Sequence, residues 1–413
     1  MDKKILRLVI IEQSKIFKSQ KDYIKREIPS FFFDTKKIVA ISGVRRCGKS
    51  TLLRQIAEKY PQFYYLNFDD ERLLNFDAGD FNNILEIFFE LFGTNGVFFF
   101  DEIQNVNGWE KFVSRLFNES YKIFITGSNA KLLSSELATS LTGRHLTLNL
   151  FPFSFREYLS YHNFNLKEFY DTKDKSKIKK YFTQYLEYGG FPEVVKSRNK
   201  NELVQLYQDV LIKDLIVRFK IKESKAFREL GLYLLSNISS LVSFNNLQKF
   251  LGIKSVTSVK NYFGFLEEAY LLFNVPKFDF SLKKQMINNK KIYAIDSGLY
   301  EAVSFKFSPN KGRLLENVVF LELKRRGNEV YYFKDKYECD FLIRHGNKIT
   351  GAIQVTDSIA SPETRRREIA GLTEAIKKHS VKSALILTDD HEEEFKIGSK
   401  KIIVMPVWKW LIE

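Results

Sequence analysis

Nine consecutive residues restrict the fold of this chain more than any other feature of its sequence. The stretch Gly43–Thr51 (GVRRCGKST) matches the pattern G-x-x-x-x-G-K-[ST] without a gap. The apolar run Ile38–Ser42 precedes it, and the helical pattern Thr51–Tyr60 follows. A glycine-rich loop between a buried strand and a helix can wrap a phosphate group with backbone N–H groups. The sequence therefore predicts a phosphate-binding loop in an α/β domain, with an ordinary glycine-containing turn as the alternative.

The residue types in this loop indicate ATP and Mg²⁺ as the expected cofactors. Lys49 is expected to reach the β- and γ-phosphates, and the Ser50 hydroxyl is expected to ligate the metal. The residues predicted to bind the nucleotide are Gly43, Val44, Arg45, Arg46, Cys47, Gly48, Lys49, Ser50 and Thr51.

A second motif supplies the acidic groups that such a site needs. Four apolar residues, Val97–Phe100, lead directly into Asp101 and Glu102. The carboxyl ends of parallel strands are where α/β sheets bind ligands. Asp101 is therefore the second predicted Mg²⁺ residue, and Glu102 the predicted general base for an attacking water. The alternative is a solvated Asp-Glu turn.

Two further polar positions are candidates for catalysis. The apolar run Ile123–Thr126 leads into Gly127-Ser128-Asn129, and Asn129 (or Ser128) is predicted to sense the γ-phosphate, unless it caps the following helix. Arg144 precedes the next apolar run. It is a candidate arginine finger, in cis or toward a neighbouring molecule, with a structural salt bridge as the alternative.

The order of patterns predicts an α/β chain with further modules. Apolar runs alternate with helical patterns as far as residue 155, which indicates a parallel sheet covered by helices. A helical segment, interrupted at Gly189–Pro192, is expected to form a lid. The following pattern of helices and two strands fits a winged helix-turn-helix. We expect the ATPase core at residues 1–155, the lid at 156–222, the winged helix at 223–300 and a last domain at 301–413.

Composition favours a cytoplasmic protein with no membrane partner. The 413 residues are 44% hydrophobic, enough for two or three domain cores. The two cysteines, Cys47 and Cys339, provide no disulfide framework. No apolar run approaches the roughly 20 residues of a membrane-spanning helix.

The positive charge of the chain is concentrated in its middle. The net charge is +15, and residues 151–300 contribute +9 of it, with 24 Lys and Arg against 15 Asp and Glu. Such an excess suits a polyanion such as duplex DNA. A basic surface that reflects only a lysine-rich composition is the alternative.

The winged-helix pattern gives this charge a specific place. The predicted recognition helix carries Ser255, Thr257, Ser258, Lys260 and Asn261. The segment Lys283–Lys291 is predicted as the wing tip. Short polar side chains and lysines suit phosphate contacts, and Asn can read adenine edges. Protein docking through the same module remains the alternative.

Taken together, these motifs resemble one family. It is the archaeal-type AAA+-related ATPases that carry a C-terminal domain of unknown function, and the similarity covers about residues 25–410. The segments that carry the resemblance are Gly43–Thr51, Asn67–Arg72, Asp101–Gln104, Thr126–Ser128, Phe151–Phe155, Gly189–Glu193 and Gly312–Asn317.

The last domain looks like a restriction-endonuclease core of the PD-(D/E)xK superfamily. The resemblance assigns Glu316 and Asp340 to a metal site and places Gln354 and Thr356 where a Glu-x-Lys pair is expected. Gln354 can offer only a carbonyl oxygen to a cation, and Thr356 cannot replace an ammonium group. The core is therefore either degenerate or rescued by another lysine, for which Lys334, Lys336 and Lys348 are candidates.

The sequence thus predicts a Mg²⁺-dependent ATPase that acts as a nucleotide switch on DNA. Two alternatives remain: an ATP-gated nuclease that uses the last domain, and an ATP-dependent scaffold that binds protein partners or further copies of itself.

Overall fold

The computed structural model describes residues 1–19, 23–127, 141–305, 310–379, 381, 383–398 and 400–413. The chain divides into two compact units, Met1–Phe151 and Pro152–Glu413. The first unit ends close to the predicted end of the ATPase core at residue 155, whereas the finer predicted boundaries remain predictions. Among the helices in these ranges, none has the length and apolar content needed to cross a membrane.

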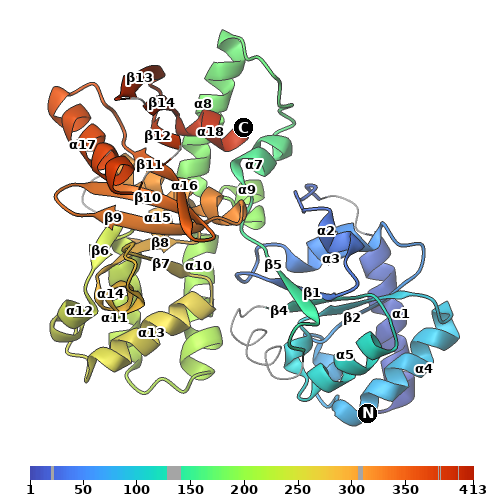
Figure 1. Ribbon diagram of the computed structural model, residues 1–413. Coiled ribbons are helices and arrows are strands. Elements are labelled where there is room, and N and C mark those ends of the chain that lie inside the picture. Colours follow the sequence, from blue (N-terminus) through green and yellow to red (C-terminus); the bar gives the residue numbers. More distant parts are fainter. Residues whose placement is uncertain (20–22, 128–140, 306–309, 380, 382, 399) are drawn as a thin grey trace. The chain divides into compact units, whose positions relative to one another are not determined.

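The first unit is built on a five-stranded parallel sheet with the strand order β2-β3-β4-β1-β5 (Figure 1). Strands β1 and β4 are buried along their whole length, which explains their continuous apolar sequences. Strand β4 lies between β1 and β3, so the two sequence motifs are separated by one inserted strand. The elements are α1 (Lys3–Ser19), α2 (Phe31–Asp34), β1 (Ile38–Ser42), α3 (Lys49–Ala57), β2 (Phe63–Asn67), α4 (Phe81–Phe92), β3 (Val97–Asp101), α5 (Trp109–Asn118), β4 (Ile123–Gly127) and β5 (His145–Asn149).

Helix α1 belongs to the core of this unit. Leu6, Val9 and Ile10 are fully buried and share one face of the helix, because they are three and four residues apart. Further along α1, the Gln13 amide donates to Asn67 O at 3.1 Å and accepts from Asn67 N at 2.7 Å. The helix therefore satisfies main-chain groups at the end of the edge strand β2.

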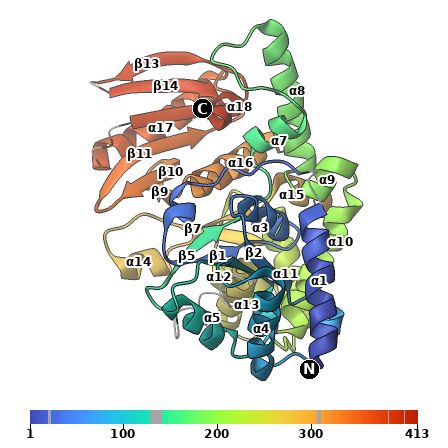
Figure 2. The same cartoon turned by 90° about the vertical axis from the view of Figure 1, so that its right-hand side faces the viewer.

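The second unit contains two sheets and most of the helices (Figure 2). The six-stranded sheet has the order β13-β14-β12-β11-β10-β9, and the three-stranded sheet has the order β6-β8-β7. The elements are α7 (Phe155–Tyr161), α8 (Thr172–Tyr188), α9 (Pro192–Ser197), α10 (Asn201–Asp209), α11 (Ser224–Ser236), β6 (Ser240–Val242), α12 (Phe244–Phe250), α13 (Val256–Glu268), β7 (Leu272–Pro276), α14 (Leu282–Ile287), β8 (Lys290–Ala294), α15 (Ser297–Val303), α16 (Lys311–Arg325), β9 (Glu329–Lys334), β10 (Glu338–His345), β11 (Lys348–Val355), α17 (Pro362–His379), β12 (Ser383–Thr388), β13 (Glu393–Ile397), β14 (Lys400–Pro406) and α18 (Val407–Ile412).

The element order from α11 to β12 follows the order of patterns in the sequence, while the winged-helix and endonuclease assignments remain predictions. Four elements of the second unit were not predicted. Strand β6 is only three residues long, β13 is a short strand near the C-terminus, α14 lies within the predicted wing tip, and α15 follows the last strand of the winged-helix pattern.

The glycine pair that interrupts the predicted lid has a structural reason. Gly189 has a φ of 75°, and a Cβ atom there would lie 2.0 Å from Asp296 Oδ1. Gly190 N donates to Asp296 Oδ2 at 2.7 Å, and Leu299 N donates to Oδ1 at 2.9 Å. Burial raises the pKa of Asp296 to about 6. The chain thus turns tightly around a buried carboxyl group that also caps α15.

Candidate nucleotide site and carboxylate cluster

The loop of residues 43–48 joins the end of β1 to the first residue of α3. Gly48 has a φ of 99°, a left-handed conformation that glycine adopts without steric cost. A Cβ atom on Gly43 would lie 2.2 Å from the main-chain oxygen of Leu150. The backbone therefore requires glycine at both glycine positions of the motif, Gly43 and Gly48.

Lys49 is buried but only loosely paired. Its side chain is 5% exposed, and its Nζ lies 3.2 Å from Gly43 O, 3.4 Å from Val44 O and 3.6 Å from Glu102 Oε1. A buried ammonium group usually needs close anionic or hydrogen-bonded partners. These long contacts leave the charge of Lys49 available for a phosphate group.

Asp101 occupies the end of β3 and is fully buried. Its carboxylate accepts hydrogen bonds from the hydroxyl groups of Thr126 and Tyr65, the latter at 3.1 Å. Burial raises the pKa of Asp101, and hydrogen bonds with Ser50 and Thr126 oppose that rise. Ser50 and Asp101, the predicted Mg²⁺ residues, therefore meet.

Glu102 has a strained backbone next to this carboxylate. Its φ is 49°, which is uncommon for a residue with a Cβ atom. Glu102 N donates to Thr126 Oγ1 at 2.9 Å, and the Gln104 amide donates to Glu102 Oε2 at 2.5 Å. One hydroxyl group, on Thr126, thus fixes both acidic residues.

These groups suit ATP and Mg²⁺. Lys49 offers a buried positive charge, and Ser50 and Asp101 offer the oxygen donors that Mg²⁺ prefers. Within the described ranges, Gln104 Oε1 is buried without a hydrogen-bond partner, next to Glu102. It can accept a hydrogen bond from a water molecule at this place.

Arg26 was not predicted as a site residue, yet its side chain forms a hydrogen bond to the main chain of the loop. This residue is 9% exposed. It donates from Nη1 to Cys47 O at 3.0 Å and from Nη2 to Phe151 O at 2.6 Å. Burial raises the pKa of the Cys47 thiol, which packs inside the loop. Thr126 and Tyr65 were also missed, because their contacts with Asp101 depend on which strands lie beside β3, and Gln104 was missed although it lies two residues after Glu102.

The two other catalytic candidates fare differently. Arg144 lies before β5, whose first residue pairs with the first residue of β1, at the amino end of the sheet. Its Nη1 donates to Ser114 Oγ at 2.6 Å. Since five strand residues span roughly 17 Å, the prediction of an arginine finger in cis is wrong. Asn129 and Ser128 lie outside the described residues.

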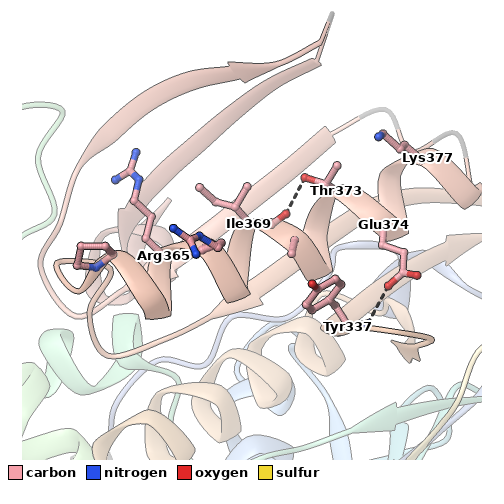
Figure 3. A pocket seen from close by; sticks show the side chains of 9 residues that line it. Tyr337, Arg365, Ile369, Thr373, Glu374 and Lys377 are labelled. Atoms are coloured by element: carbon pink, nitrogen blue, oxygen red, sulfur yellow. Dashed lines mark hydrogen bonds between the residues drawn. The ribbon is translucent and has the colours of Figure 1, made fainter.

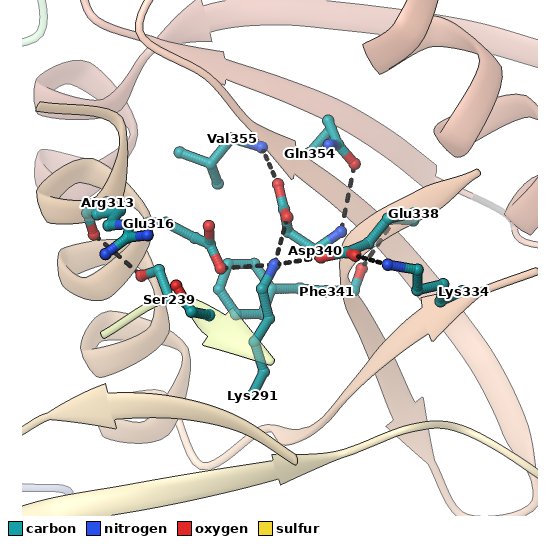
Figure 4. A network of polar contacts seen from close by, with 12 residues as sticks. Ser239, Lys291, Arg313, Glu316, Lys334, Glu338, Asp340, Phe341, Gln354 and Val355 are labelled. Carbon is teal, nitrogen blue, oxygen red and sulfur yellow. Dashed lines mark hydrogen bonds and ion pairs between the residues drawn. The ribbon is translucent and has the colours of Figure 1, made fainter. Parts of the chain in front are cut away.

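In the second unit, Glu316 of α16 and Asp340 of β10 come together, as the sequence predicted (Figure 4). The centre of the cluster is Lys291 of β8, which forms ion pairs with Glu316, Asp340 and Glu338. Lys291 is 2% exposed, so its expected contact with phosphate as part of a wing tip is wrong.

Gln354, which the sequence placed in the possible metal site, forms hydrogen bonds through both ends of its amide. Its Oε1 accepts from Asp340 N at 3.2 Å, and its Nε2 donates to Glu368 of α17. The amide oxygen is therefore already bonded to the main chain. Of the lysines proposed as replacements, Lys334 pairs with the outer oxygen of Glu338 at 3.1 Å.

Electrostatics in the cluster follow from burial. Burial and the nearby Asp340 raise the pKa of Glu316. Although burial acts to lower the pKa of Lys291, Asp340 and Glu316 raise it well above its usual range. In the part of the chain that the structure describes, no group of three or more His, Cys, Asp or Glu side chains is arranged to hold a metal ion.

A separate groove of about 680 Å³ runs along α17 (Figure 3). Glu374 on this helix accepts from Tyr337 N at 2.9 Å. The residues that line the groove are Tyr337, Pro362, Arg365, Arg366, Ile369, Ala370, Thr373, Glu374 and Lys377. It contains no member of either site, and we assign no function to it.

Comparisons with known protein families identify the domain type of the first unit. An AAA domain family matches residues 35–159, and the domains of unknown function DUF8612 and DUF4143 match residues 179–310 and 311–410. The fold and the loop define an AAA+-related P-loop ATPase with C-terminal domains of unknown function.

Two relatives align with almost the whole chain. The "Uncharacterized protein MJ1544" of Methanocaldococcus jannaschii is 39% identical and aligns with 99% of this chain and 96% of its own length. An "Uncharacterized protein" of Haemophilus influenzae is 31% identical over 96% of this chain and 99% of its own length. The chain belongs to the same family as these proteins.

Solved structures add little. The "Replication initiator DnaA bound to AMPPCP and single-stranded DNA" covers 60% of this chain and 90% of its own, with 16% identity and a TM-score of 0.27. A TM-score this low does not support an argument from its fold.

Proposed function

We propose that this protein hydrolyses ATP with Mg²⁺ and that Glu102 is the general base. The observation that carries the proposal is the meeting of Lys49, Asp101 and Glu102 at the carboxyl end of one parallel sheet. This is the edge at which α/β sheets bind ligands.

Each residue has a role that follows from its contacts. Lys49 binds the phosphate groups, and Ser50 and Asp101 would hold Mg²⁺, which neutralises charge on the phosphates when it is bound. Thr126 holds the Asp101 carboxylate and the Glu102 main chain, and so positions the two acidic residues side by side. Glu102, with Gln104 beside it, accepts a proton from the attacking water.

Replacing Glu102 tests the proposal directly. Glu102→Gln removes the base but keeps the size of the side chain. We expect ATP to bind with unchanged affinity and turnover to fall by roughly 10²- to 10⁴-fold. Glu119→Gln, an exposed residue after α5, is the matched control. Normal turnover by Glu102→Gln would refute the assignment of the base.

A second function, engagement of duplex DNA, is supported by one surface. Lys254, Lys260 and Asn261 are exposed on and next to α13, in the part of the chain that carries the +9 charge. Phosphate contacts by such lysines give an affinity that decreases steeply with salt concentration. ATP turnover could then change how this surface holds DNA.

Fluorescence anisotropy with a labelled duplex at two salt concentrations tests this second function. Lys254→Ala/Lys260→Ala should weaken binding, whereas Lys173→Ala/Lys177→Ala, which removes the same charge from exposed positions on α8, should not. Equal effects of the two pairs would indicate non-specific attraction. Binding that is absent, together with ATPase activity unaffected by DNA, would favour the protein scaffold instead.

A further inference from the structure

The carboxylate cluster of the second unit surrounds one ammonium group (Figure 4). Lys291 Nζ lies 2.6 Å from Asp340 Oδ1, 2.8 Å from Glu316 Oε1 and 2.9 Å from Glu338 Oε1. An ammonium group has three N–H donors, and three carboxylate oxygens accept them. The Lys291 side chain is 3% exposed, so water does not compete. The cation at the centre of this site is supplied by the protein itself.

The carboxylate groups also have partners besides Lys291. Asp340 Oδ2 accepts from Val355 N at 2.9 Å, and Glu316 Oε1, which faces Lys291, also accepts from Tyr293 OH at 2.7 Å. Gln354 is held between Asp340 N and Glu368. Of the groups that the endonuclease resemblance assigns to a metal, each is therefore already bonded within the protein.

The residues present therefore do not fit a catalytic metal. A divalent cation held by Glu316 and Asp340 would lie against the Lys291 ammonium, and the two positive charges would repel each other in a buried place. Lys291 also comes from the three-stranded sheet, whereas its partners come from α16 and the six-stranded sheet. The ion pairs fasten these two parts of the unit together.

We propose that the Lys291 ammonium group occupies the metal position of an endonuclease-like core. The core then stabilises the fold and does not act as a nuclease. The proposal is independent of the ATPase activity proposed above. It implies that removal of Lys291 uncovers a divalent-cation site made by Glu316, Glu338 and Asp340.

The experiment compares two substitutions in the full-length chain without nucleotide. All variants carry Ser50→Ala, which removes a ligand from the predicted Mg²⁺ site of the first unit. Lys291→Ala removes the charge and leaves space, whereas Lys291→Met removes the charge and fills the space. Binding of Mn²⁺ is measured by isothermal titration calorimetry. The melting temperature of each variant is measured with and without millimolar Mn²⁺.

We expect the Lys291 wild type to bind no Mn²⁺ in the second unit. Lys291→Ala should melt roughly 10 °C lower, bind one Mn²⁺ and regain part of its melting temperature. Lys291→Met should melt lower without rescue, and adding Asp340→Asn to Lys291→Ala should abolish Mn²⁺ binding.

Other outcomes overturn the proposal. Mn²⁺ binding by the Lys291 wild type that Asp340→Asn abolishes would show a working metal site. An unchanged melting temperature of Lys291→Ala would show that the ion pairs of Lys291 do not stabilise the fold. A folded Lys291→Ala that binds no Mn²⁺ would show that the three carboxylates do not form a metal site. If Lys291→Ala folds only with Mn²⁺ present, the proposal is supported. If it never folds, the proposal is tested by two other results: no Mn²⁺ binding to the chain with Lys291 intact, and a lower melting temperature of Lys291→Met.

Discussion

Lys49 and Lys291 are two buried lysines that face acidic side chains, and they differ in how far their charge is neutralised. Their side chains are 5% and 3% exposed. Among the residues that the structure describes, the nearest carboxylate oxygen to Lys49 Nζ is 3.6 Å away, whereas Lys291 Nζ has three within 2.9 Å. Burial alone therefore does not tell a ligand-binding lysine from a structural one.

The difference comes from what surrounds each ammonium. Around Lys49 the closest oxygens belong to the main chain of its own loop, and carbonyl groups carry only partial charge. Around Lys291 the carboxyl groups of Glu316, Glu338 and Asp340 converge from α16 and β10. The first arrangement is incomplete without an anion, and the second is complete.

Stability should separate the two lysines most strongly. Lys291→Met leaves the buried Glu316 and Asp340 and the partly exposed Glu338 without their counter-charge, so we expect the free energy of unfolding to fall by about 3–5 kcal/mol. Lys49→Met removes only long contacts and should change the melting temperature little in the absence of nucleotide. Thermal melts followed by circular dichroism measure both, with the exposed Lys283→Met as control. Equal losses would remove the distinction.

Nucleotide affinity should separate them in the opposite direction. Lys49→Met removes a charged donor to the phosphate groups, and we expect ATP affinity to fall by about 30- to 100-fold, or about 2–3 kcal/mol. Lys291→Met should bind ATP as the wild type does. Calorimetric titration with ATP and Mg²⁺ gives both constants. Unchanged affinity of Lys49→Met would mean that the loop holds the nucleotide by its backbone alone.

Lys49, Asp101 and Glu102 meet as the sequence predicted, because the motifs that carry them are short in range. The pattern of Gly43–Ser50 fixes a loop, and the apolar strand before Asp101 delivers that carboxylate to the same edge of the sheet. Thr126 is different, because its role depends on β4 lying beside β3, and strand order is not written in any one segment.

The carboxylate cluster shows where prediction from sequence ends. Glu316 and Asp340 were found because a known arrangement of helix and strands suggested them. Lys291 was assigned to a wing tip, since it ends the segment Lys283–Lys291 between two predicted strands, and its burial depends on how two sheets of the unit pack. An ion pair between residues 49 positions apart, such as Lys291 and Asp340, leaves no local pattern.

A smaller effect tests whether one hydroxyl group fixes both acidic residues of the first unit. Thr126→Val keeps the shape but loses the hydrogen bonds to Asp101 and from Glu102 N. We expect a loss of about 1–2 kcal/mol in unfolding free energy and slower ATP turnover. Thr126→Ser keeps the hydroxyl and should behave nearly as the wild type. If both variants turn over ATP normally, Thr126 does not position Glu102.

Arg144 extends the comparison to a third cation and should give the smallest effect. It lies at the end of the sheet opposite the loop, where it donates to Ser114 and covers the Phe117 ring at 5.8 Å. We expect Arg144→Ala to cost about 0.5–1.5 kcal/mol of stability by losing that hydrogen bond, with an unchanged turnover per chain. ATPase rates measured over a range of protein concentrations check this, with Arg115→Ala as control. A rate that falls in Arg144→Ala only where chains associate would identify an arginine finger acting in trans, and a cation far from its own loop would then still belong to a nucleotide site.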